Sequence, residues 1–175
     1  MNKIKNIALA ALMTIGTFGV VTFTACNKDA CKGVVCQNGG TCDASGSCVC
    51  QTGFTGTNCE KLVRDEFIGT WSGTDVCGSG SYTITLTVNT STNNINALVN
   101  NPGGFGPAIT ITGVVTSANA LSFTNANAGG GRTLSGTMTF TGGSATTGAT
   151  AMQFVYTVTP ASGAADNCTG NYTKQ

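Results

Sequence analysis

The stretch SYTITLTVN, residues 81–89, alternates apolar and polar side chains along its whole length. Ile84, Leu86 and Val88 fall on one face of an extended chain, and threonines fall on the other face. Alternation with a period of two is typical of a β-strand that has one face buried and one face in water. The stretch therefore predicts a strand whose apolar face covers a hydrophobic core.

The same alternation recurs throughout the C-terminal part of the chain, for example in AMQFVYTVT at residues 151–159. Short segments rich in glycine and asparagine separate the repeats, so strands that are neighbours in sequence should pair antiparallel. No pattern of helix length occurs among them. The pattern predicts a mainly β domain at residues 67–175, either an eight-stranded antiparallel up-and-down barrel or a β-sandwich. The eight predicted strands are residues 68–77, 81–89, 94–100, 107–116, 120–125, 132–142, 151–159 and 167–174.

Two cysteines favour the barrel over the sandwich. Cys77 ends the first predicted strand and Cys168 begins the last. In a closed meander of eight strands the first and last strands are antiparallel neighbours, so the end of one meets the start of the other. A disulfide between Cys77 and Cys168 is therefore expected. The same pairing places Trp71 opposite a residue near Lys174.

The segment FIGTW, residues 67–71, resembles the Gly-x-Trp start of lipocalin-like barrels. The resemblance implies that Trp71 plugs the closed end of the barrel beneath a basic residue of the final strand, a role that Lys174 could fill by a cation–π contact. It also implies a carrier of a small apolar ligand; the alternative is that the same side chains simply fill the core of a small barrel. The candidate lining residues are Trp71, Ile84, Leu86, Ile109, Ile111, Leu121, Phe123, Phe140, Phe154 and Tyr156.

The N-terminus has the features of an export signal. Two lysines in MNKIKN precede an apolar run at residues 7–21, and small residues follow. A membrane-spanning helix is an alternative, but the run is short and contains threonine and glycine. Plain secretion is a second alternative.

The sequence FTAC, residues 23–26, resembles the lipobox of bacterial lipoproteins. The resemblance implies a signal peptide at residues 1–25 and a palmitate-type acyl anchor on Cys26, followed by a tether at residues 26–30. Several acyl chains on one residue give stable membrane attachment. The charged tether resembles tags that send some lipoproteins of Bacteroidetes-type bacteria to the outer face of the outer membrane, and a plain solvated linker is the alternative. We expect a protein that is lipid-anchored in the bacterial outer membrane, facing either the cell surface or the periplasm.

Six of the remaining cysteines lie in residues 31–59 with the spacing C-x4-C-x5-C-x5-C-x-C-x8-C. This spacing resembles an EGF-like module, and a polar linker at residues 60–66 is expected to follow it. Spacing alone leaves several connectivities open. A zinc site is the competing interpretation, which export to an oxidising compartment argues against. The resemblance implies the disulfides Cys31–Cys42, Cys36–Cys48 and Cys50–Cys59, and the module lacks the acidic run of its calcium-binding relatives.

Catalytic chemistry has few candidates in this sequence. The chain contains no histidine, and its formal net charge of +1 argues against a nucleic-acid partner. Between residues 69 and 175 the only charged side chains are those of Asp75, Arg132, Asp166 and Lys174. Asp75 and Asp166 are interpreted as solvated turn residues, with a small cation site or an acidic dyad as the alternative. We expect no enzyme activity, no cofactor and no metal.

These observations give two functional hypotheses. The first is a non-enzymatic, membrane-anchored surface lipoprotein that binds a protein or glycan partner, with the EGF-like module as a spacer. The second is a lipocalin-like carrier of a small apolar ligand.

Overall fold

The structure is a computed structural model that describes residues 30–144 and 148–175. The predicted signal peptide, the acylation site Cys26 and most of the predicted tether lie outside the described residues. Within the described part of the chain, no helix combines the length and the apolar composition needed to cross a bilayer.

A small disulfide-rich module forms the N-terminal part of the described chain. It contains the strand pair β1 (Thr41–Cys42) and β2 (Cys48–Val49), and the strand pair β3 (Phe54–Thr55) and β4 (Lys61–Leu62). Its disulfides have the predicted pairing. Of its apolar side chains up to β4 only Cys59 is fully buried, so cross-links rather than a core hold the module together. The three disulfides are Cys31–Cys42, Cys36–Cys48 and Cys50–Cys59.

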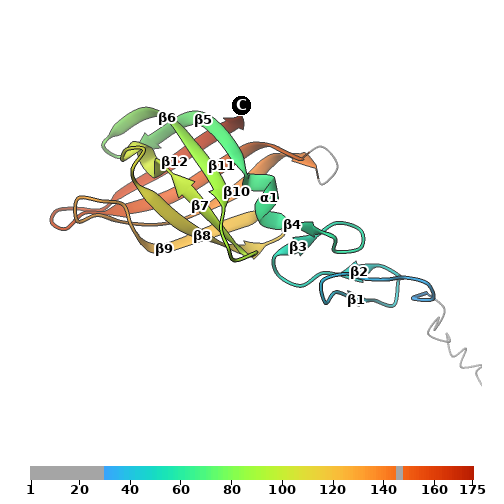
Figure 1. The fold of residues 1–175 in the computed structure, drawn as a ribbon. Helices are drawn as coiled ribbons and strands as arrows, with labels where there is room; N and C mark the ends of the chain where they lie inside the picture. The colour runs from blue at the N-terminus through green and yellow to red at the C-terminus, as the bar shows by residue number, and fades with distance from the viewer. Residues whose placement is uncertain (1–29, 145–147) are drawn as a thin grey trace, which may run out of the picture.

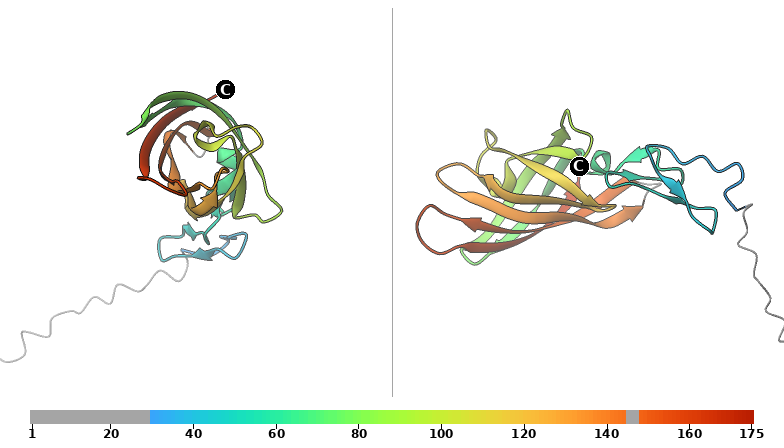
Figure 2. Two further views of the ribbon diagram at one scale, coloured as in Figure 1. Left: turned by 90° about the vertical axis from the view of Figure 1, so that its left-hand side faces the viewer. Right: turned by 90° about the horizontal axis from the view of Figure 1, so that it is seen from below.

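Eight antiparallel strands then form a closed barrel (Figures 1 and 2). Each strand pairs with the next in sequence, and the last strand, β12, pairs with the first, β5. The molecule is therefore an up-and-down barrel and not a sandwich. The strands are β5 (Gly69–Cys77), β6 (Gly80–Thr90), β7 (Asn96–Asn100), β8 (Thr110–Ser117), β9 (Ala120–Asn127), β10 (Thr133–Ser144), β11 (Gly148–Thr159) and β12 (Asp166–Lys174).

All eight predicted strands are present, and their ends differ from the prediction by a few residues. The largest differences are at the start of β8, which begins at Thr110 instead of residue 107, and at the start of β11. The 3-10 turn η1 (Pro102–Gly104) and Pro107 lie before β8. Because proline has no N–H to donate to a strand ladder, the pairing begins only after it.

The barrel interior is filled by the inward face of each strand. In β6, Ile84, Leu86 and Val88 are buried, whereas the intervening threonines face outward, as the alternation predicts. Large side chains such as Phe154 and Met138 from the opposite side of the barrel are also fully buried. This apolar burial is the main stabilising contribution to the barrel.

A short helix closes one end of the barrel. The helix α1 (Val63–Phe67) leads directly into β5, and the Phe67 ring stacks on Phe140 with ring centroids 3.9 Å apart. The indole Nε1 of Trp71 donates a hydrogen bond to the carbonyl of Phe67 at 2.7 Å. The Nζ atom of Lys174 lies 5.3 Å from the centre of the Trp71 ring, in the contact that the lipocalin-like resemblance implies.

The segment at residues 60–66, expected to be a polar linker, is instead folded. It forms β4 and most of α1, with Val63 and Phe67 buried on one helix face. Arg64 is also buried, because its guanidinium donates hydrogen bonds to the carbonyls of Ser91 and Asn93 at 2.6 and 2.7 Å. The many charged residues of this segment favoured a linker, although Val63 and Phe67 are four residues apart and so fall on the same face of a helix.

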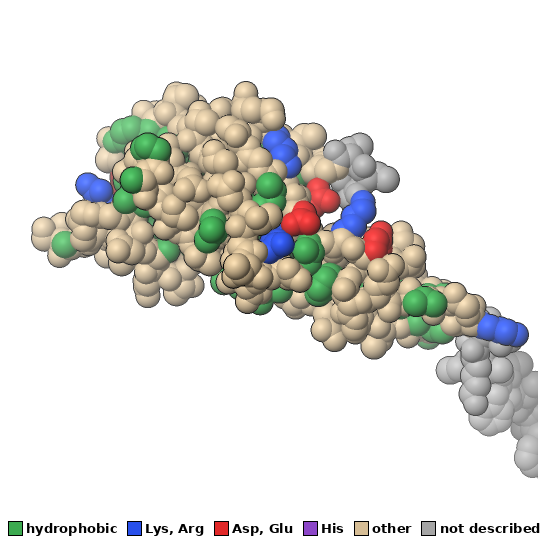
Figure 3. Space-filling view, viewed as in Figure 1, with side chains coloured by type: hydrophobic (Ala, Val, Ile, Leu, Met, Phe, Trp, Pro, Cys, Tyr) green, Lys and Arg blue, Asp and Glu red, His purple; other side chains and the backbone are tan. Residues whose placement is uncertain are grey.

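Charged side chains are unevenly distributed over the visible surface. Figure 3 shows most of them gathered where the small module meets the barrel, with further basic side chains at the opposite end of the barrel and at the tip of the small module, and a largely uncharged barrel surface between. Hydroxyl and amide side chains cover that surface in cross-strand hydrogen-bonded pairs such as Ser72 with Thr85 and Gln153 with Asn171.

Candidate functional site at the barrel mouth

The barrel has an open end, here called the mouth, opposite the end that α1 closes. The turn between β5 and β6, the loop that contains η1, and the loops that join β9 to β10 and β11 to β12 surround it (Figures 1 and 2). A cavity of about 380 Å³ lies there. Its lining includes the side chains of Tyr82, Phe105, Arg132, Tyr156, Pro160 and Asp166.

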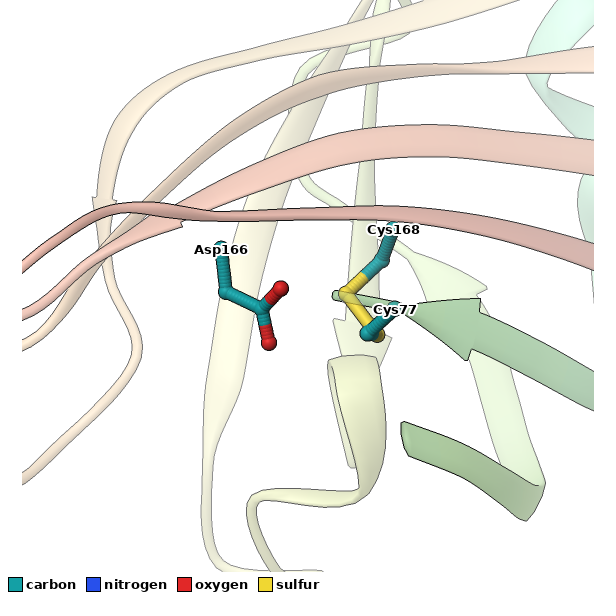
Figure 4. Close-up of side chains that lie close together, drawn as sticks. All are labelled: Cys77, Asp166 and Cys168. Atoms are coloured by element: carbon teal, nitrogen blue, oxygen red, sulfur yellow. A yellow bond between two sulfur atoms is a disulfide. The ribbon is translucent and has the colours of Figure 1, made fainter. Parts of the chain in front are cut away.

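A disulfide between the first and last strands forms part of the cavity wall. Cys77 pairs with Cys168 across β5 and β12, with Cα atoms 4.1 Å apart, as predicted from the closed meander. Figure 4 shows the carboxylate of Asp166 close to this disulfide. The cluster lacks the chemistry of a metal site, because a metal-binding cysteine must be a thiolate and both sulfur atoms are bonded to each other.

Two side chains of opposite charge, Arg132 and Asp166, lie at the rim of the mouth, and each contacts a different group. The guanidinium carbon of Arg132 lies 5.4 Å from the centre of the Phe105 ring. In the described part of the chain the Arg132 guanidinium has no carboxylate partner. The ion pair found in that part of the chain lies in α1 and joins Arg64 to Asp65. The hydroxyl of Tyr82 donates to Ser79 at 3.1 Å, and the Ser79 hydroxyl donates to Asp166.

A buried carboxylic acid lies beneath the aromatic floor of the cavity. The side chain of Asp75 is fully enclosed inside the barrel, where the hydroxyl groups of Tyr156 and Tyr172 donate hydrogen bonds to its two oxygens. Tyr156 also lines the cavity, so this hydrogen bond fixes the floor. Gly170, the β12 partner of Asp75, provides the space: a Cβ atom there would lie 1.9 Å from Asp75 Oδ1.

Burial shifts the pKa of the Asp75 carboxyl group. Desolvation raises the pKa of Asp75, and the hydrogen bonds from the two tyrosine hydroxyls act in the opposite direction. Burial, followed by the hydrogen bond and the charge of Asp75, raises the pKa of both Tyr156 and Tyr172, so the two phenols are protonated donors at neutral pH.

The interpretation of Asp75 as a solvated turn residue is wrong. Asp75 lies inside β5, two and four residues after Gly73 and Trp71, and therefore shares the inward face of the strand with Trp71. Asp166 is half-buried at the start of β12, four residues or roughly 13 Å along the strand from Gly170. The two carboxylates accept hydrogen bonds from different hydroxyls and do not form an acidic dyad.

The predicted lining residues lie mostly in the core. Only Tyr156 of that set reaches the mouth cavity. Phe140 is partly buried at the closed end, and Ile109 is half-buried in the loop before β8. The remaining members pack within the barrel and are at most 3% exposed: Trp71, Ile84, Leu86, Ile111, Leu121, Phe123 and Phe154.

Sequence reasoning missed Tyr82, Phe105 and Pro160 as cavity residues. They occupy separate turns and loops, or the start of a strand, and no spacing in the sequence indicates that they meet. The available signal was Arg132, one of very few charges in the domain, which follows a run of glycines in a loop that the topology brings to the mouth.

Comparisons with known proteins give a fold-level likeness only. No family model matches the chain, and no curated protein matches it. Among solved structures, it is similar to a redesigned β-barrel, with a TM-score of 0.45 and 14% sequence identity over 65% of this chain and 95% of that one.

Proposed function

We propose that this chain is a non-enzymatic, lipid-anchored binding protein of a bacterial outer membrane, and that it binds its ligand at the barrel mouth. One observation carries the proposal: the mouth cavity lies at the barrel end opposite α1, through which the chain enters from the disulfide-rich module (Figure 1). A protein held by its N-terminus would therefore present the cavity away from the membrane.

The anchor in this proposal is the acylated Cys26. The lipobox-like FTAC and the preceding apolar run support it, as does the short distance of five residues to Cys31. The module at residues 31–59 is then an EGF-like spacer, supported by its cysteine spacing and its three disulfides. Cross-linked modules of this kind suit an oxidising, extracellular setting.

The proposal that the protein is not an enzyme rests on the side chains that reach the mouth. The chain contains no histidine, and Asp75 is hydrogen-bonded beneath the floor instead of facing the cavity. Arg132 and Asp166 are suited to hold a ligand by hydrogen bonds and charge.

A carrier of a small apolar ligand is the second candidate, and the aromatic lining of the cavity favours it. Phe105 and Tyr82 offer apolar ring surface, and about 380 Å³ is within the usual range for small-molecule sites. Because side chains fill the barrel interior, such a ligand would occupy the mouth rather than the centre of the barrel.

The test uses a soluble chain of residues 27–175, which contains every described element. Its thermal unfolding is measured with a panel of neutral sugars, acidic sugars, amino acids and fatty acids. A ligand that binds only the folded state stabilises it by RT ln(1 + [L]/Kd), so at a fixed ligand concentration a tighter ligand raises the midpoint further. We expect at least one class to stabilise the chain and to lose that effect in Phe105→Ala. No stabilisation by any class, or turnover of a bound ligand, would contradict the proposal.

A further inference from the structure

We propose that the ligand of the mouth is an acidic sugar: a single sugar residue that carries a carboxylate, such as a uronic acid at the end of a glycan. This inference rests on the proposed function and names the chemical class that the cavity recognises. Three features of the mouth carry it: a guanidinium with no carboxylate partner among the described residues, a hydrogen-bonded carboxylate that lines the same cavity, and aromatic side chains in its lining.

The guanidinium of Arg132 supplies the carboxylate site. It lies over the Phe105 ring, 5.4 Å from its centre, and no carboxylate of the described residues forms an ion pair with it. An arginine fork binds a carboxylate through two parallel, charge-assisted hydrogen bonds. A ligand carboxylate at the rim would therefore find a positively charged partner that no carboxylate of the described residues already binds.

Asp166 restricts the ligand to one that also donates hydrogen bonds. Its carboxylate lines the same cavity and is oriented by the Ser79 hydroxyl. A ligand that had only negative charge would be repelled by Asp166. A ligand that was only hydrocarbon would leave the Asp166 oxygens without hydrogen-bond donors from the ligand. The hydroxyl groups of a sugar ring can donate to this carboxylate while the ring's own carboxylate binds Arg132.

Aromatic rings provide the surface for the sugar ring itself. Phe105 and Tyr156 line the cavity together with Tyr82, which is 46% exposed. The C–H face of a sugar ring is apolar and packs against such rings, while its hydroxyl edge stays available for hydrogen bonds. A cavity of about 380 Å³ suits one or two rings, and its open side lets a glycan chain continue into solvent.

The mouth is held in shape without a ligand. The Cys77–Cys168 disulfide fixes one wall, and the hydrogen bond from Tyr156 to Asp75 fixes the floor. A site that is ordered in advance loses less conformational entropy on binding. This is what a small polar ligand requires, because it buries little apolar surface of its own.

The experiment measures the affinity of residues 27–175 for glucuronic acid, glucose and laurate by calorimetry. Glucose has the same ring without the carboxylate, and laurate has a carboxylate without the ring. We expect glucuronic acid to bind at least about tenfold more tightly than glucose, and Arg132→Gln to remove that difference. Lys32→Gln, an exposed basic residue of the small module, is the matched control and should change nothing.

Asp166→Asn separates sugar recognition from simple charge attraction. If the sugar hydroxyls donate to Asp166, this variant weakens glucuronic acid binding by roughly fivefold to tenfold. Stronger binding in Asp166→Asn would show that only charge acts, and would overturn the inference. Equal affinity for glucose and glucuronic acid would also overturn it. Binding of laurate alone would overturn it while leaving the proposed binding function in place.

Discussion

Asp75 is a carboxylic acid that the barrel encloses completely, and among the described residues its side chain accepts hydrogen bonds from two tyrosine hydroxyls and from no basic group. A buried carboxylate is costly unless donors replace the lost water, and two tyrosine hydroxyls do so here. Its partner strand contributes Gly170, whose missing side chain leaves the necessary space. Accommodating this one acid thus depends on three residues of the two final strands, Tyr156 on β11 and both Gly170 and Tyr172 on β12.

The pH dependence of stability should report this burial. Because burial raises the pKa of Asp75 above its usual value of about 3.8, the folded state binds the proton more tightly than the unfolded state. Asp75 therefore contributes stability that is present at low pH and is lost as the pH rises through the raised pKa. The free energy of unfolding, measured by urea titration from about pH 3 to pH 8, should show this loss in the wild type and not in Asp75→Asn.

Val76→Ala serves as the control, since Val76 lies beside Asp75 on β5, is exposed and carries no titratable group. Its pH profile should run parallel to that of the wild type. Parallel pH profiles for the wild type and Asp75→Asn would show that the acid is not stabilised in its protonated form by burial.

Asp75 also shows what a sequence reveals about single residues. Asp75 is four residues after Trp71, so the alternation along the strand puts both on the inward face. An aspartate so close to a turn is nevertheless more commonly solvated than buried. Whether a carboxylate can be buried depends on its donors. The hydroxyls of Tyr156 and Tyr172 lie more than eighty residues away in sequence, so the pattern around Asp75 contained no sign of them.

Among the structural elements, α1 has only five residues but makes several contacts that join it to the barrel. Phe67 connects the short helix to the barrel by stacking on Phe140, and its carbonyl accepts the hydrogen bond of the Trp71 indole. Glu66 Oε2 accepts a hydrogen bond from the backbone N–H of Ala149 at 3.1 Å. The helix is therefore a structural part of the barrel and not a spacer in front of it.

Phe67→Ala should destabilise the barrel substantially. Removing a buried phenylalanine costs about 3–5 kcal/mol through lost burial and the cavity that remains. Trp71, the only tryptophan of the chain, lies beside this position and provides the measurement. We expect a lower urea midpoint by tryptophan fluorescence and an emission maximum shifted to longer wavelength in the folded state, because water gains access to the indole.

Val76→Ala is the matched control for this prediction, since Val76 lies on β5 but is 59% exposed. Its effect should be within about 0.5 kcal/mol of zero. A loss of less than about 1 kcal/mol in Phe67→Ala would mean that α1 does not close the barrel.

The strands were predictable because each has one face in water and the other in the core. Apolar and polar residues therefore alternate along each strand. SYTITLTVN at residues 81–89 became β6 with one added residue at each end. Helix α1 was not predictable by the same route, since five residues are too few to display a helical period. Its charged residues, Arg64 among them, suggested a solvated linker until the loop carbonyls that bind Arg64 were known.

At the scale of the whole molecule, closure of the barrel was predictable and the mouth cavity was not. Cys77 and Cys168 marked the two strands that meet, so topology followed from two residues. The mouth cavity depends on the shapes of several loops, which place Phe105 and Arg132 together from positions far apart in sequence. Loop conformations of this kind carry no periodic signal.

The orientation of the molecule follows from which end is anchored. The small module and α1 lie at one end of the barrel, and the cavity lies at the other (Figure 2). A lipid on the N-terminal side of the module makes the cavity the part farthest from the membrane. Anchoring at Cys26 is thus the claim on which the proposed function depends most.

Intact-mass spectrometry of the full-length protein, extracted from bacterial membranes without reduction, tests this claim most directly. We predict a chain that begins at Cys26, carries the added mass of acyl chains, and contains its other eight cysteines as four disulfides. A species that retains residues 1–25, or one that begins at Cys26 without acyl mass, would contradict the account.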